Sequence, residues 1–500
     1  MYRKEHTNQL TFENFYLPFG GHLCGSNRWV ILSEQIPWRQ IEEAYGQHFC
    51  QDNGSPAKTA RIAFGALIIK ERLGTSDRET VEQIRENPYL QYFLGLMEYQ
   101  DTPPFDHSMM THFRKRFDKD MLTSINESIV QGVMEPDGEN KAVDTHSDKD
   151  QGSKDQNNPP SHRGKMIVDA TCTPADIAYP TDLTLLNEAR QKSEEIIDTM
   201  HAPFVGVGKK PRTYRQKARK AYLAVAKQKK PSCKKIRKAI GQQLRYLKRN
   251  LGHIDRMAGV GLLKFLDKRL YRLLLVIKEL YRQQDWMYEN RTHKVSDRIV
   301  SLYQPHVRPM VRGKAKSPVE FGAKVSISLV NGFSFVEKIG WDAYNESSDL
   351  IEQIERYHKR FGFYPASVHV DKIYRTRENR RYCKKKGIRL SGPPLGRPTD
   401  EAELLKEQKK LQHQDEIDRI VVEGKFGQGK RRFSLARVMT KLAQTSEVSI
   451  VVAFIVMNLE KILSGVISFL LFVWKWLLER QRLEDMRREN QVPTVLKAAA

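Results

Sequence analysis

Cysteine is scarce and scattered in this 500-residue chain. The five cysteines form no C-x-x-C pair, so the spacing expected of a zinc knuckle is missing. An odd, unclustered set of cysteines fits a reducing cytosol rather than a disulfide framework. The first residues also lack the apolar core of a signal peptide. These absences predict a cytoplasmic protein.

The chain also lacks a long run of apolar residues. Near its C-terminus, Val448 to Leu459 and Ile462 to Trp474 are uncharged, but a charged pair divides them. Neither stretch reaches the about 20 residues that a membrane-spanning helix needs. We therefore expect buried helices that pack on a sheet, and no membrane partner. Trp474 and Trp476 keep an interfacial location open as the alternative.

Acidic residues are missing from one long segment. Residues 209–249 contain 17 lysines and arginines and no acid, and the whole chain carries a formal charge of +24. Such an excess favours a polyanionic partner through long-range attraction and counterion release. A solvated basic helix is the alternative reading. The residues that we expect to contact DNA in this segment are Arg215, Arg219, Lys220, Lys234 and Lys235.

The pattern of the first 162 residues predicts a helical domain and a linker. Residues 1–130 contain short helical patterns separated by turn signals, and one pattern ends in Arg114, Lys115 and Arg116. Short helices with basic residues at one end suit a DNA-binding module of the helix-turn-helix type, and a plain helical core fits equally well. Residues 131–162 are rich in Asp, Asn, Ser, Gly and Lys, which predicts a disordered linker.

The remainder predicts an α/β domain that a helical block interrupts. Strand patterns occupy parts of 163–182 and 317–460, and Asn331-Gly332 between two alternating runs is a strong hairpin signal. Between them, residues 183–316 are helical and basic, so we interpret them as an insertion into the core. Residues 461–500 are expected to form C-terminal helices with apolar and charged parts.

Three widely separated acids are candidates for one metal site. Asp169 ends the apolar run 166–168, Asp371 ends the alternating run 367–370, and Glu423 lies in a charged helical pattern. Carboxylates of this kind can hold two divalent cations, which cut and join phosphodiesters by in-line displacement. Taken singly, Asp169 is better explained as the cap of a turn, and Asp371 as the cap of a helix that begins near Thr376.

Two cations accompany the glutamate. Arg419 and Glu423 are four residues apart and share one helical face, so that Arg419 can grip a DNA backbone; a solvated ion pair is the alternative. Lys430 shares that face only if the helix continues. Gly424, Gly427 and Gly429 predict that it ends or bends there.

Several motifs resemble those of bacterial insertion-sequence transposases with a DDE triad. Arg419, Glu423 and Lys430 match three letters of the tyrosine-arginine-glutamate-lysine signature of one large group. The signature tyrosine would stand three residues before Arg419, where this chain has Glu416. The other stretches that carry the resemblance are 164–171, 370–374, 65–70, 76–79, 88–90, 104–108 and 113–117.

The resemblance implies a fold and a chemistry. The expected core is an RNase H-like mixed sheet flanked by helices, and Asp169, Asp371 and Glu423 would be both the catalytic residues and the metal ligands. It implies two Mg²⁺ ions, with Mn²⁺ as a substitute, and Arg419 and Lys430 on DNA. The partners would be double-stranded DNA, as transposon ends and target, and a second copy of the chain on the DNA. The protein would be associated with the bacterial nucleoid.

Two other functions fit the same residues. One is a DNA-binding protein without catalysis, derived from a transposase, for which Glu416 is the hint. The other is a structure-selective nuclease of the same fold that cuts without joining. Divalent-metal-dependent cleavage separates the first alternative from a transposase, and strand transfer from a precut end separates the second.

Overall fold

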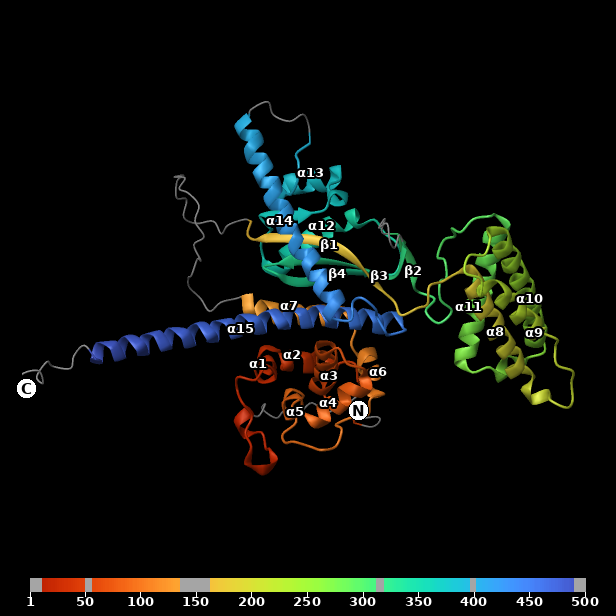
Figure 1. Ribbon diagram of the computed structural model, residues 1–500, viewed down its shortest axis with the longest axis horizontal. Coiled ribbons are helices and arrows are strands. Elements are labelled where there is room, and N and C mark those ends of the chain that lie inside the picture. Colours follow the sequence, from red (N-terminus) through yellow and green to blue (C-terminus); the bar gives the residue numbers. More distant parts are fainter. Residues whose placement is uncertain (1–10, 50–55, 135–161, 312–318, 396–401, 490–500) are drawn as a thin grey trace, which may run out of the picture. The chain divides into compact units, whose positions relative to one another are not determined.

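The computed structural model describes residues 11–49, 56–134, 162–311, 319–395 and 402–489 (Figure 1). The chain divides into two compact units. Unit 1 comprises Met1–Gly164, Leu329–Phe335 and Val451–Ala500, and unit 2 comprises Lys165–Ser328 and Val336–Ile450. Most of the predicted linker, 135–161, lies outside the described residues.

Unit 1 contains the predicted N-terminal helices. After two 3₁₀ turns at Phe12–Asn14 and Pro18–Gly20, its helices are α1 (Arg28–Gln35), α2 (Trp38–Gly46), α3 (Ala60–Leu73), α4 (Asp77–Glu86), α5 (Pro88–Phe93), α6 (Met109–Arg116) and α7 (Lys119–Met134). Side-chain caps begin α3 and α4, where Thr59 and Ser76 accept hydrogen bonds from the amides of Ile62 and Glu79. The aromatic core of this unit includes Phe64, Phe93, Phe113 and Phe117, all fully buried.

A buried hydrogen-bond network connects the tip of the β-hairpin, Leu329–Phe335, to two helices within unit 1. The Asn458 carboxamide oxygen accepts hydrogen bonds from the Ser334 amide and hydroxyl, each at 2.9 Å. Its nitrogen donates to the Asn126 oxygen and to the Ser334 carbonyl, each at 2.8 Å. All three residues are buried, so each bond satisfies a group that water cannot reach. Asn126 lies on α7, and Asn458 lies on α15 (Ala443–Glu489).

Unit 2 is built on a mixed, six-stranded sheet among the described residues. The strand order is β2-β3-β1-β5-β6, and β4 also pairs with β3. Strands β1 and β5 are parallel, as are β5 and β6, whereas β2 and β3 are antiparallel. The strands are β1 (Lys165–Pro174), β2 (Arg308–Val311), β3 (Val319–Val330), β4 (Phe333–Gly340), β5 (Ser367–Val370) and β6 (Arg389–Leu390).

The hairpin between β3 and β4 confirms the Asn-Gly prediction. Asn331 and Gly332 both have positive φ angles, 50° and 76°, which a two-residue turn of type I′ requires. The parallel strands need helical crossovers. These are α12 (Leu350–Phe361) between β4 and β5, and α13 (Arg377–Lys386) between β5 and β6. A sheet in this order with flanking helices is the RNase H-like core that the sequence predicted.

Helix α14 (Ala402–Arg432) packs on β1 and β5 and crosses one face of the sheet (Figure 1). The prediction that its glycines would end it is wrong. The helix runs unbroken through Gly424, Gly427 and Gly429. Each glycine costs about 1 kcal/mol in a helix interior. Burial of Val422 and Phe426, at 0% and 8% exposed, offsets that cost by packing this part of the helix.

The segment predicted as a helical insertion, 183–316, is helical as far as Glu289, but its last part contains β2, a strand of the core sheet. It contains α8 (Asp182–His201), α9 (Arg215–Ala226), α10 (Cys233–Gly259) and α11 (Lys268–Glu289), with short 3₁₀ turns at Ala202–Phe204 and Leu262–Phe265. Asp267 caps α11 by accepting a hydrogen bond from the Leu270 amide at 2.6 Å. Helices α8, α10 and α11 share one apolar core around Leu186, Leu247 and Ile277, and α9 packs against α10 and α8.

The C-terminal apolar stretches form one helix, α15, where two were expected. Among the described residues, Ala443–Val466 is long and apolar enough to cross a membrane by length and composition, which corrects the reading from the separate stretches. Of its apolar window, 72% is buried. The helix is thus covered by protein over most of this length, as the core helix of a soluble protein is. Residues 490–500 lie outside the description.

Candidate active site

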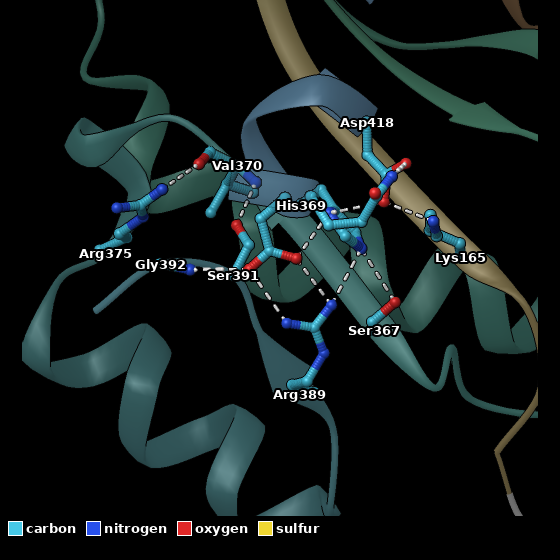
Figure 2. Close-up of polar contacts among 11 residues, drawn as sticks. Lys165, Ser367, His369, Val370, Arg375, Arg389, Ser391, Gly392 and Asp418 are labelled. Atoms are coloured by element: carbon cyan, nitrogen blue, oxygen red, sulfur yellow. Dashed lines mark hydrogen bonds and ion pairs between the residues drawn. The ribbon is translucent and has the colours of Figure 1, made fainter. Parts of the chain in front are cut away.

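The pairing of β1 with β5 brings the two predicted aspartates to neighbouring positions. Val168 pairs with Val370, so Asp169 and Asp371 follow one residue later on adjacent parallel strands. Such strands are about 4.8 Å apart. The end of β5 is fixed by side chains, because the Val370 amide donates to the Ser391 hydroxyl at 3.0 Å and its carbonyl accepts from Arg375 at 3.1 Å (Figure 2).

Asp169 is the most deeply set of the predicted carboxylates. Burial raises its pKa to about 6; the Ala170 amide, which donates to it at 2.8 Å, opposes this shift. The nearby carboxylates of Glu346 and Asp371 raise the pKa further, and the Arg419 guanidinium lowers it. Asp169 therefore lies near other carboxylates, and the single Arg419 guanidinium balances their negative charge only in part.

Asp371 caps a turn and also contacts the late helix. Its Oδ1 accepts from the Lys372 amide at 2.6 Å, which begins the 3₁₀ turn Lys372–Tyr374. The same oxygen accepts from Arg419 Nη1 at 2.9 Å. Thr376, not Asp371, caps α13. The capping role and the site role thus coexist in one side chain.

Arg419 joins the second aspartate to the glutamate. While Nη1 donates to Asp371, Nη2 donates to Glu423 Oε1 at 3.2 Å, one helical turn further along α14. The structure thus brings Asp169, Asp371, Arg419 and Glu423 together beside the middle of β1 and the end of β5. Three carboxylates around one guanidinium leave a formal excess of negative charge, and oxygen ligands of this type suit Mg²⁺.

A second group of possible ligands lies nearby, and the sequence reasoning missed it. His369, Asp415 and Asp418 offer ligand atoms that all lie within 4.8 Å of one another. Across the described residues, Asp169, Asp371 and Glu423 do not form a group that tight, since Arg419 bonds to two of them. The spacing of Asp415 and Asp418, eight and five residues before Glu423, was the signal in the sequence.

The second group already contains its own cations. Arg389 binds both oxygens of Asp415, at 2.8 and 3.0 Å, and Lys165 pairs with Asp418 (Figure 2). His369 Nδ1 lies 3.4 Å from Asp415 and 3.8 Å from Asp418. Burial lowers the pKa of His369, with Asp415 acting in the opposite direction. Two carboxylates thus face two permanent cations, which disfavours a divalent ion here.

The other predicted residues are spread over the chain. Because α14 continues, Lys430 lies two turns beyond Glu423 and shares its face, contrary to the expectation of a break. Glu416, at the position of the signature tyrosine, is exposed on α14. Within the insertion, Arg215 pairs with Asp198 at 2.7 Å. Exposed positions on α9 and α10 are held by Arg219, Lys220, Lys234 and Lys235.

One predicted DNA contact in unit 1 is corrected. Arg114 is buried, and its guanidinium forms a two-point pair with Asp77, with Nη1 2.9 Å from Oδ2. A side chain enclosed in this way supports the helical core and is not available to a phosphate. Arg116 is half-buried over the Phe49 ring, 4.8 Å from its centroid, and Lys115 is exposed.

Comparison with known proteins gives matches in both units. Residues 368–460, which include Asp371 and Glu423, match the family model described as Transposase DDE domain. Residues 20–116 match the model described as Transposase domain (DUF772). The chain is 33% identical over 162 residues to the uncharacterized protein ORF8 in the nfe locus of Rhizobium meliloti, a match that covers 32% of this chain and 69% of that protein. No solved structure matches it significantly.

Proposed function

Because the chain belongs to the DDE transposases of bacterial insertion sequences, we propose that it binds the terminal inverted repeats of its own element and cuts the DNA there. It then joins the freed 3′-hydroxyl to target DNA. No serine, cysteine or covalent intermediate is required, since the displacement is direct. The observation that carries the proposal is the meeting of Asp169, Asp371 and Glu423 around Arg419.

The three carboxylates are the proposed metal ligands. The family depends on divalent metals, and we propose two Mg²⁺ ions, replaceable by Mn²⁺, held by Asp169, Asp371 and Glu423. The donor set fits, because it consists of oxygens, and the raised pKa of Asp169 reports a buried carboxylate whose charge lacks compensation. When bound, such ions supply charge stabilisation to the attacking and leaving oxygens.

Arg419 has two proposed roles. In the metal-free protein it neutralises Asp371 and Glu423, which would otherwise repel each other. With divalent cations bound to the carboxylates, the Arg419 guanidinium would be available to bind a DNA phosphate in two-point geometry. Lys430 would bind the backbone two turns further along the same face of α14. Glu423 and Arg419 thus share one helix, so that metal and phosphate are aligned by a single rigid element.

The insertion supplies the proposed wider DNA surface. Arg219 and Lys220 on α9, and Lys234 and Lys235 on α10, are exposed in a segment without acids. Phosphate contacts of this kind give affinity and register, and sequence choice needs base contacts as well. Two transposon ends must be held together for joining, so we propose a homodimer on DNA. We also propose a cytoplasmic, nucleoid-associated protein with no membrane partner.

The test uses the purified full-length chain and labelled duplexes from the two ends of its element. Wild-type protein should nick these duplexes with Mg²⁺ or Mn²⁺, and should join a precut end to a supercoiled target plasmid. Asp169→Asn should bind the duplexes with nearly unchanged affinity and cut neither. Cleavage without joining would favour the structure-selective nuclease, and cleavage by Asp169→Asn would remove this residue from the site.

One observation favours a non-catalytic protein as the second candidate. Glu416 stands where the signature has a tyrosine, and its exposed carboxylate would repel a phosphate nearby. A protein of this second kind would bind end duplexes and leave them intact under every divalent-metal condition. The presence of all three carboxylates makes the transposase the better supported function.

A further inference from the structure

We propose that a partly buried ionic cluster fixes α14 on the sheet and thereby directs Arg419 and Glu423 toward the two aspartates. The cluster, called here the polar clamp, consists of Lys165, His369, Arg389, Asp415 and Asp418. None of these side chains belongs to the proposed metal site, so each acts as a positioning residue. The inference rests on the proposed function, because it explains how that site is held in shape.

The polar clamp connects one turn of α14 to three neighbouring strands (Figure 2). From β6, Arg389 makes its two-point pair with Asp415, and the Gly392 amide donates to the same carboxylate at 3.2 Å. From β1, Lys165 pairs with Asp418. From β5, His369 lies between the two carboxylates. Its Nε2 lies 3.0 Å from the Ser367 hydroxyl, which holds the ring in place.

Apolar packing does little to hold this half of α14. From Glu403 to Val421, Asp415 is the buried residue among those whose burial is described, and it is 5% exposed. Leu404, Leu411 and Ile420 are 44%, 48% and 61% exposed. Buried hydrophobic residues appear only later, at Val422 and Phe426. Ionic contacts therefore set the rotation of the helix about its axis, and its position along that axis, before it reaches Arg419.

Three of the four elements that form the polar clamp, β1, β5 and α14, also carry or directly precede a predicted ligand. Lys165 precedes Asp169 by four residues on β1, and His369 precedes Asp371 by two on β5. On α14, Asp415, Arg419 and Glu423 follow one another at intervals of four. A slip of one residue along α14 would rotate its side chains by about 100° and shift them by about 1.5 Å. Fixing Asp415 thus fixes the direction of Glu423 two turns later.

A metal ion in the polar clamp is the less favourable reading. Both oxygens of Asp415 already accept from Arg389, and Asp418 accepts from Lys165 and, at 3.1 Å, from Gln414. A divalent ion would have to displace two cations that are already in contact. An ion bound by His369 would also lie close to the Arg389 guanidinium, because Arg389 Nη2 is 3.4 Å from His369 Nε2. The two positive charges would repel each other.

The test compares metal binding and cleavage in variants of the polar clamp. Asp415→Asn, Arg389→Gln and the double variant are titrated with Mn²⁺ and followed by electron paramagnetic resonance, and then assayed on end duplexes. We expect about 10- to 100-fold weaker Mn²⁺ binding and slower cleavage at saturating DNA, the usual effect of disturbing residues that orient metal ligands. End-DNA affinity should stay within about threefold, and the double variant should be no worse than the poorer single one.

A buried ion pair elsewhere on the same sheet provides the matched control. Glu337 on β4 pairs with Arg360 on α12 at 3.0 Å, with side chains 0% and 3% exposed. Glu337→Gln should lower the melting temperature without changing Mn²⁺ affinity. If the variants of the polar clamp behave like this control, or melt early yet bind Mn²⁺ normally when folded, the inference is wrong. Should a clamp variant fail to fold, the more exposed Asp418→Asn takes its place.

Two further outcomes separate the possible failures. A wild-type protein that neither binds Mn²⁺ nor cleaves end DNA overturns the proposed function itself. The second outcome concerns a charge exchange, in which Asp415→Arg and Arg389→Asp are combined in one protein. If the wild type cleaves end DNA but the exchanged protein binds Mn²⁺ no better than either single variant, the polar clamp loses its support. The transposase assignment would then still stand.

Discussion

Replacing Asp169 by asparagine is expected to stabilise the metal-free protein above pH 6. The carboxylate has an ordinary pKa of 3.8 in the unfolded chain and about 6 in the folded one. The folded state therefore holds this proton more tightly, and its relative stability falls as the pH rises through that window. Asparagine resembles the protonated acid in shape and can still accept from the Ala170 amide.

The size of the effect follows from the shift. A rise of about two units in the pKa of Asp169 corresponds to about 3 kcal/mol of folding free energy, at about 1.4 kcal/mol per unit. For a structural unit of the size of unit 2, a change of about 1 kcal/mol in folding free energy moves the melting temperature by roughly 2–4 °C. Asp169→Asn should therefore match the wild type at pH 4 and melt roughly 6–12 °C higher at pH 8 without metal.

The assay is thermal unfolding, followed by circular dichroism from pH 4 to pH 8 in the presence of a chelator. Asp255→Asn serves as the control, because Asp255 is 56% exposed and its pair with Lys278 lies on the surface. Adding Mg²⁺ should raise the melting temperature of the wild type and leave that of Asp169→Asn unchanged. A gain for Asp169→Asn that is equal at pH 4 and pH 8 would refute the idea of an uncompensated buried charge.

Three other predictions follow from the same structure. Cleavage should weaken about tenfold for each pH unit below about 6, because protonated Asp169 binds metal poorly, and a flat profile from pH 5 to pH 8 would contradict this. Arg114→Ala should cost about 2–3 kcal/mol of folding free energy in urea denaturation by leaving Asp77 unpaired, whereas a loss of DNA affinity alone would restore Arg114 as a DNA contact. Glu416→Tyr should tighten end-DNA binding by roughly fivefold, or about 1 kcal/mol, in a fluorescence titration, and no change would place this position away from DNA.

Local patterns predicted the elements that hold the site. Alternation and the Asn-Gly pair revealed the β3–β4 hairpin, and the apolar run before Asp169 revealed β1, which extends to Pro174. These features are encoded by neighbours in the chain, so a single sequence suffices. The predicted domain boundaries, in contrast, stay predictions; in the structure the hairpin tip Leu329–Phe335 clusters with the N-terminal helices.

Features that depend on distant partners escaped the sequence reasoning. The sequence indicated an exposed, cationic Arg114, because Asp77, the carboxylate that pairs with it, lies 37 residues earlier in the chain. Asp415 and Asp418 were part of a charged helical pattern with no assigned role, since the cations that pair with them come from β1 and β6. Helix α14 continues past its glycines because Val422 and Phe426 are buried, a gain in packing that propensity alone does not contain.

The most direct test of the shared metal site is a Mn²⁺ titration of four proteins by electron paramagnetic resonance. The wild type is compared with Asp169→Asn, Asp371→Asn and Glu423→Gln, each in complex with end DNA. If the three carboxylates hold the same ions, every variant should bind Mn²⁺ at least about tenfold more weakly than the wild type. Binding that survives all three substitutions and disappears in His369→Ala would contradict the account.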